Sequence, residues 1–173
     1  ARKYGGPGTP AGRKKGGIQS QIRRRLFPSQ YSHCNLRKQI YTPLESLNLS
    51  EFIGILLGDG GVNNNFQIVI TLHKANDKEY ADFVVKLIQK LFNTTPALYH
   101  YRALRRQNVV GISLSSIQAV EFLAEKGFPK GNKTRIQIDV QDWIKDNAEF
   151  SKSCLRGLID TDGGVYYHRH ISG

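Results

Sequence analysis

The order of hydrophobic and polar positions predicts a folded unit that starts near Asn48. Asn48 followed by Glu51 has the form of a helix-capping box. The apolar run behind it predicts a buried helix over residues 49–59, which the glycine pair at 60–61 ends. The preceding residues 29–47 are predicted to be a linker.

Strand and helix periods then alternate along the chain. Residues 66–73 place apolar and polar side chains in turn, which is typical of a strand with one buried face. The further predicted elements are a helix capped by Asn76, strands over 97–104 and 108–114, a helix from Ser115 or Ser116 to about Lys126, a short strand over 135–140, a helical turn at Trp143 and Ile144, a helix from Ser151 or Ser153 to Asp162, and a strand over 165–171. This order predicts an α+β fold in which an antiparallel sheet carries helices on one side.

The positive charge is concentrated at the N-terminal end. The net charge is +11, and residues 1–44 hold ten Lys or Arg and no acid, whereas residues 45–173 hold fifteen bases and fourteen acids. A basic arm beside a nearly neutral domain indicates binding to phosphate backbones; a solubilising or ribosome-like tail is the alternative. The predicted DNA contacts in this arm are Arg13, Lys14, Lys15, Arg23, Arg24 and Arg25.

Within the N-terminal segment, residues 1–17 are rich in Gly, Pro, Lys and Arg and are predicted not to fold alone. Such a narrow cationic stretch suits a DNA minor groove. A short helix is predicted over residues 18–26, so residues 1–47 form a flexible basic arm with its linker.

Other classes of protein are excluded by composition. The chain has no run of roughly 20 apolar residues that could span a membrane, and it has no Cys-x-x-Cys pair for a zinc finger. Two cysteines are too few for a disulfide scaffold, which favours an intracellular location in the cytoplasm, the nucleoid or an organelle.

A repeated segment carries most of the functional information. Residues 52–62 and 155–165 are identical at five of eleven positions, at an offset of 103, and both contain Asp-Gly-Gly-Val. Both segments are predicted helices, and small residues recur four positions apart in each, which allows two helix backbones to approach closely. The predicted interface residues are Gly54, Gly58, Gly157 and Thr161.

One carboxylate ends each repeated helix, Asp59 in the first and Asp162 in the second. If the helices pack side by side in parallel, these two acids meet. The pairing is unfavourable, because both carboxylates repel each other and lie at the negative end of a helix dipole. A divalent cation, Mg²⁺ or Mn²⁺, relieves this repulsion, and such a site beside a phosphodiester is typical of nucleases.

The second copy, residues 155–163, resembles the motif of the LAGLIDADG homing endonuclease family. It departs from that motif at Arg156 and Thr161, and the first copy is more divergent but keeps Gly54, Asp59 and Gly60. The resemblance implies an αββαββα fold with a saddle-shaped sheet that lies on double-stranded DNA. It places a first domain at residues 48–147 and the start of a second pseudo-symmetric domain at 148–173.

The family also implies residue roles. The last acid of each motif binds the catalytic metal, which assigns Asp59 and Asp162, and a basic residue nearby polarises the phosphate, for which we predict Lys133. Asp160 matches the earlier acid of the motif, but Leu57 replaces it in the first copy. The predicted activity is a site-specific double-strand cut by hydrolysis. The candidate DNA contacts on strands and turns are Gln67, Thr71, His73, His100, Arg102, Arg105, Arg106, His168 and His170.

Three alternatives stay open beside the endonuclease: a DNA-binding regulator that does not cut, an RNA-splicing maturase on the same fold, and an endonuclease embedded in an intein. Only eleven residues follow Asp162, and no Met is present. We therefore expect the chain to be incomplete, and to be a monomer once the second half is supplied.

Overall fold

The computed structural model describes residues 8–27, 30, 40–100 and 108–163. The chain divides into two compact units, residues 1–38 and 39–173. The second unit begins before the predicted Asn48. Its first described segment is fastened to the domain, because the Ile40 amide donates to Gln118 Oε1 (3.2 Å) and the Tyr41 amide to the Phe92 carbonyl (3.2 Å).

The first unit contains one basic helix, α1 (Pro10–Leu26). Thr9 caps it by accepting a hydrogen bond from the Gly12 amide (3.1 Å), and Pro10 occupies the first helical turn. The prediction that residues 10–17 are unfolded is therefore wrong, because these two start signals outweigh the glycines that follow. Every residue of α1 is at least partly exposed.

Within the described part of the second unit, four strands form one antiparallel sheet in the order β1-β2-β4-β3. The strands are β1 (Gly60–Asn64), β2 (Gln67–His73), β3 (Ala97–His100) and β4 (Val109–Ser115). The helices are α2 (Leu47–Leu57), α3 (Lys78–Phe92), α4 (Ile117–Glu125), α5 (Lys133–Ile136), α6 (Asp142–Lys145) and α7 (Ala148–Asp162). The α+β fold with an antiparallel sheet is thus confirmed.

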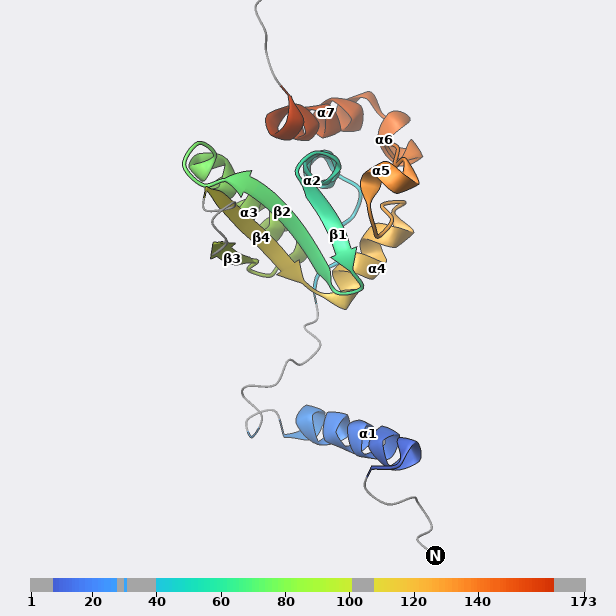
Figure 1. The fold of residues 1–173 in the computed structure, drawn as a ribbon. Coiled ribbons are helices and arrows are strands. Elements are labelled where there is room, and N and C mark those ends of the chain that lie inside the picture. Colours follow the sequence, from blue (N-terminus) through green and yellow to red (C-terminus); the bar gives the residue numbers. More distant parts are fainter. Residues whose placement is uncertain (1–7, 28–29, 31–39, 101–107, 164–173) are drawn as a thin grey trace, which may run out of the picture. The chain divides into compact units, whose positions relative to one another are not determined.

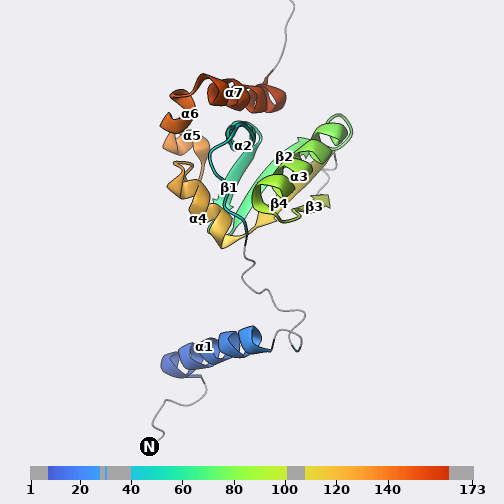
Figure 2. The same cartoon turned by 180° about the vertical axis from the view of Figure 1, so that it is seen from behind.

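The helices α3 and α4 lie on one face of the sheet, as the two opposite views show (Figures 1 and 2). The core forms between these helices, α2 and the covered face, and its largest fully buried side chains include Phe52, Phe92 and Phe128. Among the described residues, no helix covers the opposite face of β2 and β4 (Figure 1). We call this side of β2 and β4 the open face, because no described helix packs against it.

Several predicted elements are shifted. Ser46, not Asn48, caps α2 by accepting from the Leu49 amide (3.3 Å). The predicted cap Ser116 of α4 and the helical turn at Trp143 are confirmed. The predicted Asn76 cap is wrong, because the residue that precedes α3 is Asp77, which instead accepts a hydrogen bond from the His73 amide (2.8 Å).

Two further differences lie in the second half of the unit. The predicted strand over 135–140 is wrong: residues 133–136 form the one-turn helix α5, which ends at Gln137 with a left-handed φ of 47°. Asn147 caps α7, so this helix begins before Ser151. The strand predicted at 165–171 lies outside the described residues, as do positions 101–104 of the strand predicted at 97–104.

The two repeated helices, α2 and α7, pack side by side, as predicted from their small residues. A side chain on Gly54 would meet the Cys154 carbonyl and the Leu158 amide nitrogen (3.0 Å), and one on Gly157 would meet the Glu51 carbonyl and the Ile55 amide nitrogen (3.0 Å). Further along both helices, a side chain on Gly58 would meet Thr161, so the contacts advance in the same direction and the helices are parallel.

Polar contacts join the N-terminal halves of the same two helices. Ser50 Oγ donates to the Phe150 carbonyl (2.5 Å), and Ser153 Oγ donates to the Leu47 carbonyl (2.8 Å). These bonds and the close glycine contacts together fix the axial register of α2 against α7.

We expect Gly157→Ala to lower the free energy of unfolding by about 1–3 kcal/mol, because the added methyl group forces the two helices apart. This loss should appear although alanine favours a helix over glycine by about 1 kcal/mol. Chemical denaturation measures the effect. The control is Gly61→Ala, where the nearest atom to the new methyl group is 3.9 Å away. A Gly157→Ala protein as stable as the wild type would contradict the close packing.

Candidate active site

The candidate active site lies where α2 and α7 end. Asp59 follows the cap residue of α2 and is half-buried, and its carbonyl accepts from the Thr71 amide of β2 (3.1 Å). The short step from α2 into β1 therefore fixes the backbone of Asp59 between a helix and the sheet.

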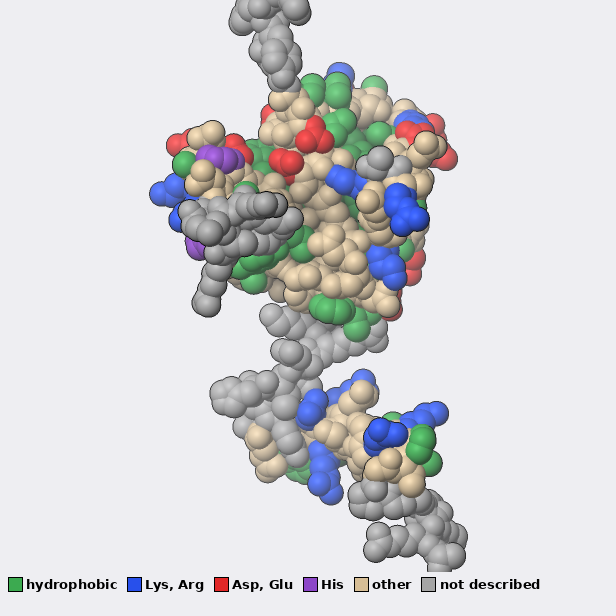
Figure 3. Space-filling model, viewed as in Figure 1, with side chains coloured by type: hydrophobic (Ala, Val, Ile, Leu, Met, Phe, Trp, Pro, Cys, Tyr) green, Lys and Arg blue, Asp and Glu red, His purple; other side chains and the backbone are tan. Residues whose placement is uncertain are grey.

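Asp162 is the last residue of α7, and its side chain is exposed. Its Cγ atom lies 3.5 Å from the position that a Cβ atom on Gly58 would take, and Thr161 contacts the same position. The two predicted carboxylates thus come from the adjoining ends of two parallel helices. On this face of the molecule, acidic side chains gather below α7 with a basic side chain beside them (Figure 3).

The pKa of the Asp59 carboxyl reflects the proximity of Asp162. Burial raises the pKa of the Asp59 carboxyl above its ordinary value, and the Asp162 carboxylate raises it further, as does Asp77 more weakly. The Lys133 ammonium acts in the opposite direction. Because a cation between the carboxylates would favour their charged forms, the arrangement suits a positively charged ligand.

Lys133 is brought to the same place by α5. Its side chain is half-buried, and Nζ donates to the carbonyls of Leu56 (3.0 Å), Leu57 (2.7 Å) and Gly58. Burial lowers the pKa of this ammonium group, while Asp162 and Asp59 oppose the shift. From the sequence, Lys133 was predicted only to lie in a loop before the second motif. In the structure its side chain lies at the C-terminal end of α2.

An ion pair between the buried Glu51 and the exposed Arg156 crosses the helix interface further from the carboxylates. Arg156 donates from Nε to Glu51 Oε1 (2.8 Å) and from Nη2 to Oε2 (2.5 Å). The Glu51 side chain is 4% exposed and that of Arg156 is 61% exposed. Sequence reasoning identified Arg156 only as a departure from a motif and missed its partner.

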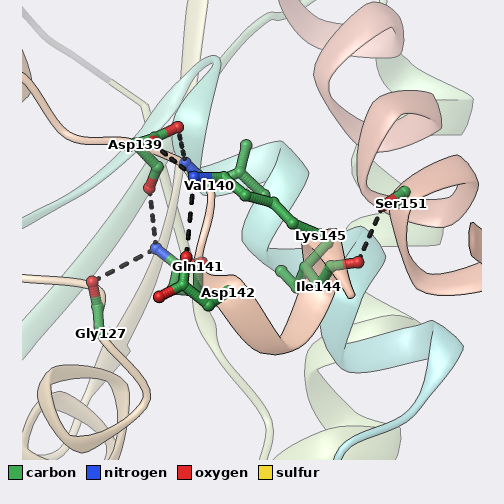
Figure 4. Close-up of polar contacts among 8 residues, drawn as sticks. All are labelled: Gly127, Asp139, Val140, Gln141, Asp142, Ile144, Lys145 and Ser151. Carbon is green, nitrogen blue, oxygen red and sulfur yellow. Dashed lines mark hydrogen bonds and ion pairs between the residues drawn. The ribbon is translucent and has the colours of Figure 1, made fainter. Parts of the chain in front are cut away.

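The connection between α5 and α7 has its own polar contacts (Figure 4). Asp139 pairs with Lys145 (2.5 Å), and Gln141 Nε2 donates to the carbonyls of Asp139 (3.2 Å) and Gly127 (3.3 Å). Ser151 in α7 donates to the Ile144 carbonyl (2.8 Å). This connection fastens the start of α7 to the domain and so helps to set where Asp162 lies.

The open face of the sheet holds some of the predicted DNA contacts. Gln67, Thr71 and His73 of β2 share this face, since they alternate with the buried Ile70 and its neighbours. Gln67 is already engaged, because its Nε2 atom donates to Ser113 Oγ (2.9 Å). This places Ser113 of β4 on the same face.

The strand β3 presents a different residue from the predicted one. His100 pairs with the buried Val110, so it occupies the opposite face from Thr71. Tyr99 pairs with Gly111, as Thr71 does, and therefore shares the open face. A side chain on Gly111 would collide with the Tyr99 ring, so the ring lies across the sheet at this position. Sequence reasoning missed Tyr99 because the pairing register of β3 was unknown.

The remaining predicted contacts fall in two places. Arg13, Lys14, Lys15, Arg23 and Arg25 lie exposed on α1, and Arg24 is partly exposed there. Outside the described residues lie Arg102, Arg105, Arg106, His168 and His170. The helix α1 contains these six basic residues and no acidic residue.

Two further findings bound the site. Within the described residues, no three His, Cys, Asp or Glu side chains come together as a group that could hold a metal ion, and the candidate ligands are the two carboxylates. None of the helices that the structure describes is long and apolar enough to cross a membrane.

Paired helices beside an antiparallel sheet agree with the family that the repeated motif resembles, and a sequence comparison tests that resemblance. The model of the LAGLIDADG DNA endonuclease family matches residues 49–148, more than half of the 173 residues. The chain belongs to the LAGLIDADG DNA endonuclease family. The matched region includes Asp59 and Lys133 and ends at the first residue of α7.

A solved structure of mesophilic variants of the homing endonuclease I-DmoI is similar to this chain. The sequences are 17% identical, the match covers 68% of this chain and 59% of that chain, and the TM-score is 0.42. This chain therefore spans about 59% of the length of that protein. No curated protein matches this chain.

We expect Arg156→Leu to destabilise the domain by roughly 1–3 kcal/mol, because it leaves the buried Glu51 carboxylate without its hydrogen bonds. The double variant Glu51→Gln/Arg156→Leu should recover part of this loss, since no charge stays buried. Thermal and chemical denaturation of both variants provide the comparison. A double variant that is less stable than Arg156→Leu would show that the buried charge is not the cause.

Proposed function

We propose that this chain carries the catalytic centre of a site-specific DNA endonuclease that makes a double-strand cut by metal-dependent phosphodiester hydrolysis. The observation that supports it best is the meeting of Asp59 and Asp162 at the ends of two parallel helices in a protein of this family. A scaffold that only bound DNA would gain nothing from two adjoining carboxylates that repel each other.

The residues present fit a divalent cation, Mg²⁺ or Mn²⁺. Carboxylate oxygens are the ligands that such hard cations prefer, and one or two carboxylates with water and substrate phosphate oxygens are a usual Mg²⁺ set. When bound, the cation would activate a water molecule and neutralise charge on the phosphate. Asp59 and Asp162 would hold it, and the fixed backbone of Asp59 would keep the two carboxylates in place between helix and sheet.

DNA binding is assigned to the open sheet face and to α1. On the sheet, Thr71, His73 and Tyr99 offer polar and aromatic groups to the edges of bases or to sugars. On α1, lysine and arginine side chains offer charge to phosphates, which strengthens binding without reading sequence. Because α2 and α7 belong to one chain, both proposed metal ligands come from a single molecule.

Asp59→Asn or Asp162→Asn should each abolish cutting and leave DNA binding largely intact, because each removes a charged metal ligand and keeps the side-chain shape. The substrate is a duplex selected for cleavage by the wild type from a randomised library. Cutting is followed on gels with Mg²⁺, and binding by fluorescence anisotropy with Ca²⁺. The matched control is Asp160→Asn, an exposed carboxylate two positions before Asp162, which should still cut. Cutting by either ligand variant would refute the mechanism.

Replacing Arg13, Lys14 and Lys15 together by Gln should weaken DNA binding and make it less sensitive to salt. The slope of log affinity against log salt should fall by about 0.9 for each phosphate that the variant no longer neutralises. These bases lie in the first half of α1, where positive charge opposes the helix dipole, so their removal should not unfold the helix. Titrations at several salt concentrations measure the slope, with Gln19→Ala/Gln21→Ala as control. An unchanged slope would exclude these three residues from the interface.

A further inference from the structure

The Lys133 ammonium occupies the C-terminal end of α2. Three backbone carbonyls surround it, those of Leu56 (3.0 Å), Leu57 (2.7 Å) and Gly58. An ammonium group has three protons and no acceptor. Its donors are therefore fully used by the helix end, and none is left for a phosphate oxygen.

The end of α2 depends on this contact more than most helix ends do. The last carbonyls of a helix have no partner within it, and a left-handed residue after the helix usually satisfies them. Here Gly58 has a φ of −76°, and its amide donates only to the Gly54 carbonyl (3.1 Å). Lys133 supplies, from a distant part of the chain, the donors that a usual cap would provide.

The segment that carries Lys133 is itself fixed. Asn132 caps α5 by accepting from the Arg135 amide (3.2 Å), and the Gly131 amide donates to the Val62 carbonyl of β1 (3.1 Å). The strand β1 begins directly after Asp59. The loop that carries Lys133 is therefore hydrogen-bonded to the strand that follows the end of α2.

We propose that Lys133 is a positioning residue, which holds the terminal carbonyls of α2 and so keeps Asp59 beside Asp162, and that it does not contact the scissile phosphate. This inference rests on the proposed function, in which the two carboxylates bind a divalent cation. It replaces the assignment of Lys133 as the phosphate-polarising group. A phosphate contact would require one of the three carbonyl bonds to break.

The two roles predict opposite changes in metal affinity without DNA. If Lys133 only places positive charge near the carboxylates, Lys133→Met removes a charge that repels the cation, and Mn²⁺ binds more tightly. If Lys133 holds the helix end, the same change weakens Mn²⁺ binding about tenfold or more, as removal of an outer-shell partner does. We expect the weaker binding, measured by isothermal titration with Mn²⁺.

Two further variants test whether the loss of Mn²⁺ affinity is specific to the contact that Lys133 makes. Lys133→Arg keeps the charge and several donors, and it should recover part of the Mn²⁺ affinity that Lys133→Met loses. Lys130→Met is the matched control, since Lys130 lies exposed in the same loop and bonds the Asn65 side chain. It should bind Mn²⁺ as the wild type does.

Hydrogen exchange provides a second readout that needs no metal. The Gly58 amide should exchange faster in Lys133→Met, because the last turn of α2 frays when its carbonyls lose their donor. If Lys133→Met does not fold, Lys133→Gln, which retains two amide protons, is measured in its place with the same expectations. Either tighter Mn²⁺ binding by Lys133→Met or unchanged exchange of the Gly58 amide would overturn the positioning role.

The outcomes separate this inference from the proposed function. If the wild type binds no Mn²⁺, or if Asp162→Asn binds it equally well, the metal site fails while the exchange rate of Gly58 still decides the role of Lys133. If Asp162→Asn loses Mn²⁺ and Lys133→Met gains affinity, the metal site stands and the positioning role is wrong.

Discussion

The close approach of α2 and α7 is the constraint on which the rest of this domain depends. At Gly54 and Gly157 the facing backbone leaves no room for a side chain, so the two helices can meet in only one register. Each helix then ends at the same level and delivers one carboxylate, Asp59 or Asp162. The geometry of the candidate site is therefore a result of helix packing, and the sheet serves to hold α2 in place.

This arrangement is costly in the free protein. Two carboxylates lie at negative helix ends, and burial of Asp59 disfavours its charged form in addition to the repulsion from Asp162. The Lys133 ammonium offsets part of the cost, and the apolar contacts of α2 with the core stabilise the helix against it. A domain built in this way is expected to gain stability from any ligand that binds the carboxylates, because such a ligand binds only the folded state.

The sequence predicted those features that local patterns determine. The repeat of 52–62 at 155–165 predicted both the helix pair and its carboxylates, because small residues at helical spacing and a matched acid are visible in the residues alone. The face of β2 that packs on the core was predicted from the alternation of apolar and polar residues along this strand. The assignment of metal binding to Asp59 and Asp162 remains a prediction.

Other features depend on contacts between distant parts of the chain. The side of the sheet on which Tyr99 lies is set by its pairing with Gly111, which the residues of β3 do not reveal. The pattern at 135–140 is typical of a strand, whereas α5 forms at 133–136 and places Lys133. The early start of α1 depends on Thr9 and Pro10, whose combined effect outweighs the nearby glycines.

The ion pair between Arg156 and Glu51 makes the two repeated helices unlike each other. At the offset of 103, Arg156 corresponds to Ile53, so a pair of two α2 helices from separate chains would set Glu51 against an aliphatic side chain. Two carboxylates would then be buried without partners, at a cost of several kcal/mol. The interface thus favours the pairing of α2 with α7 over the pairing of two α2 helices. The two halves of the candidate site are therefore chemically distinct, and a change in one helix need not be matched in the other.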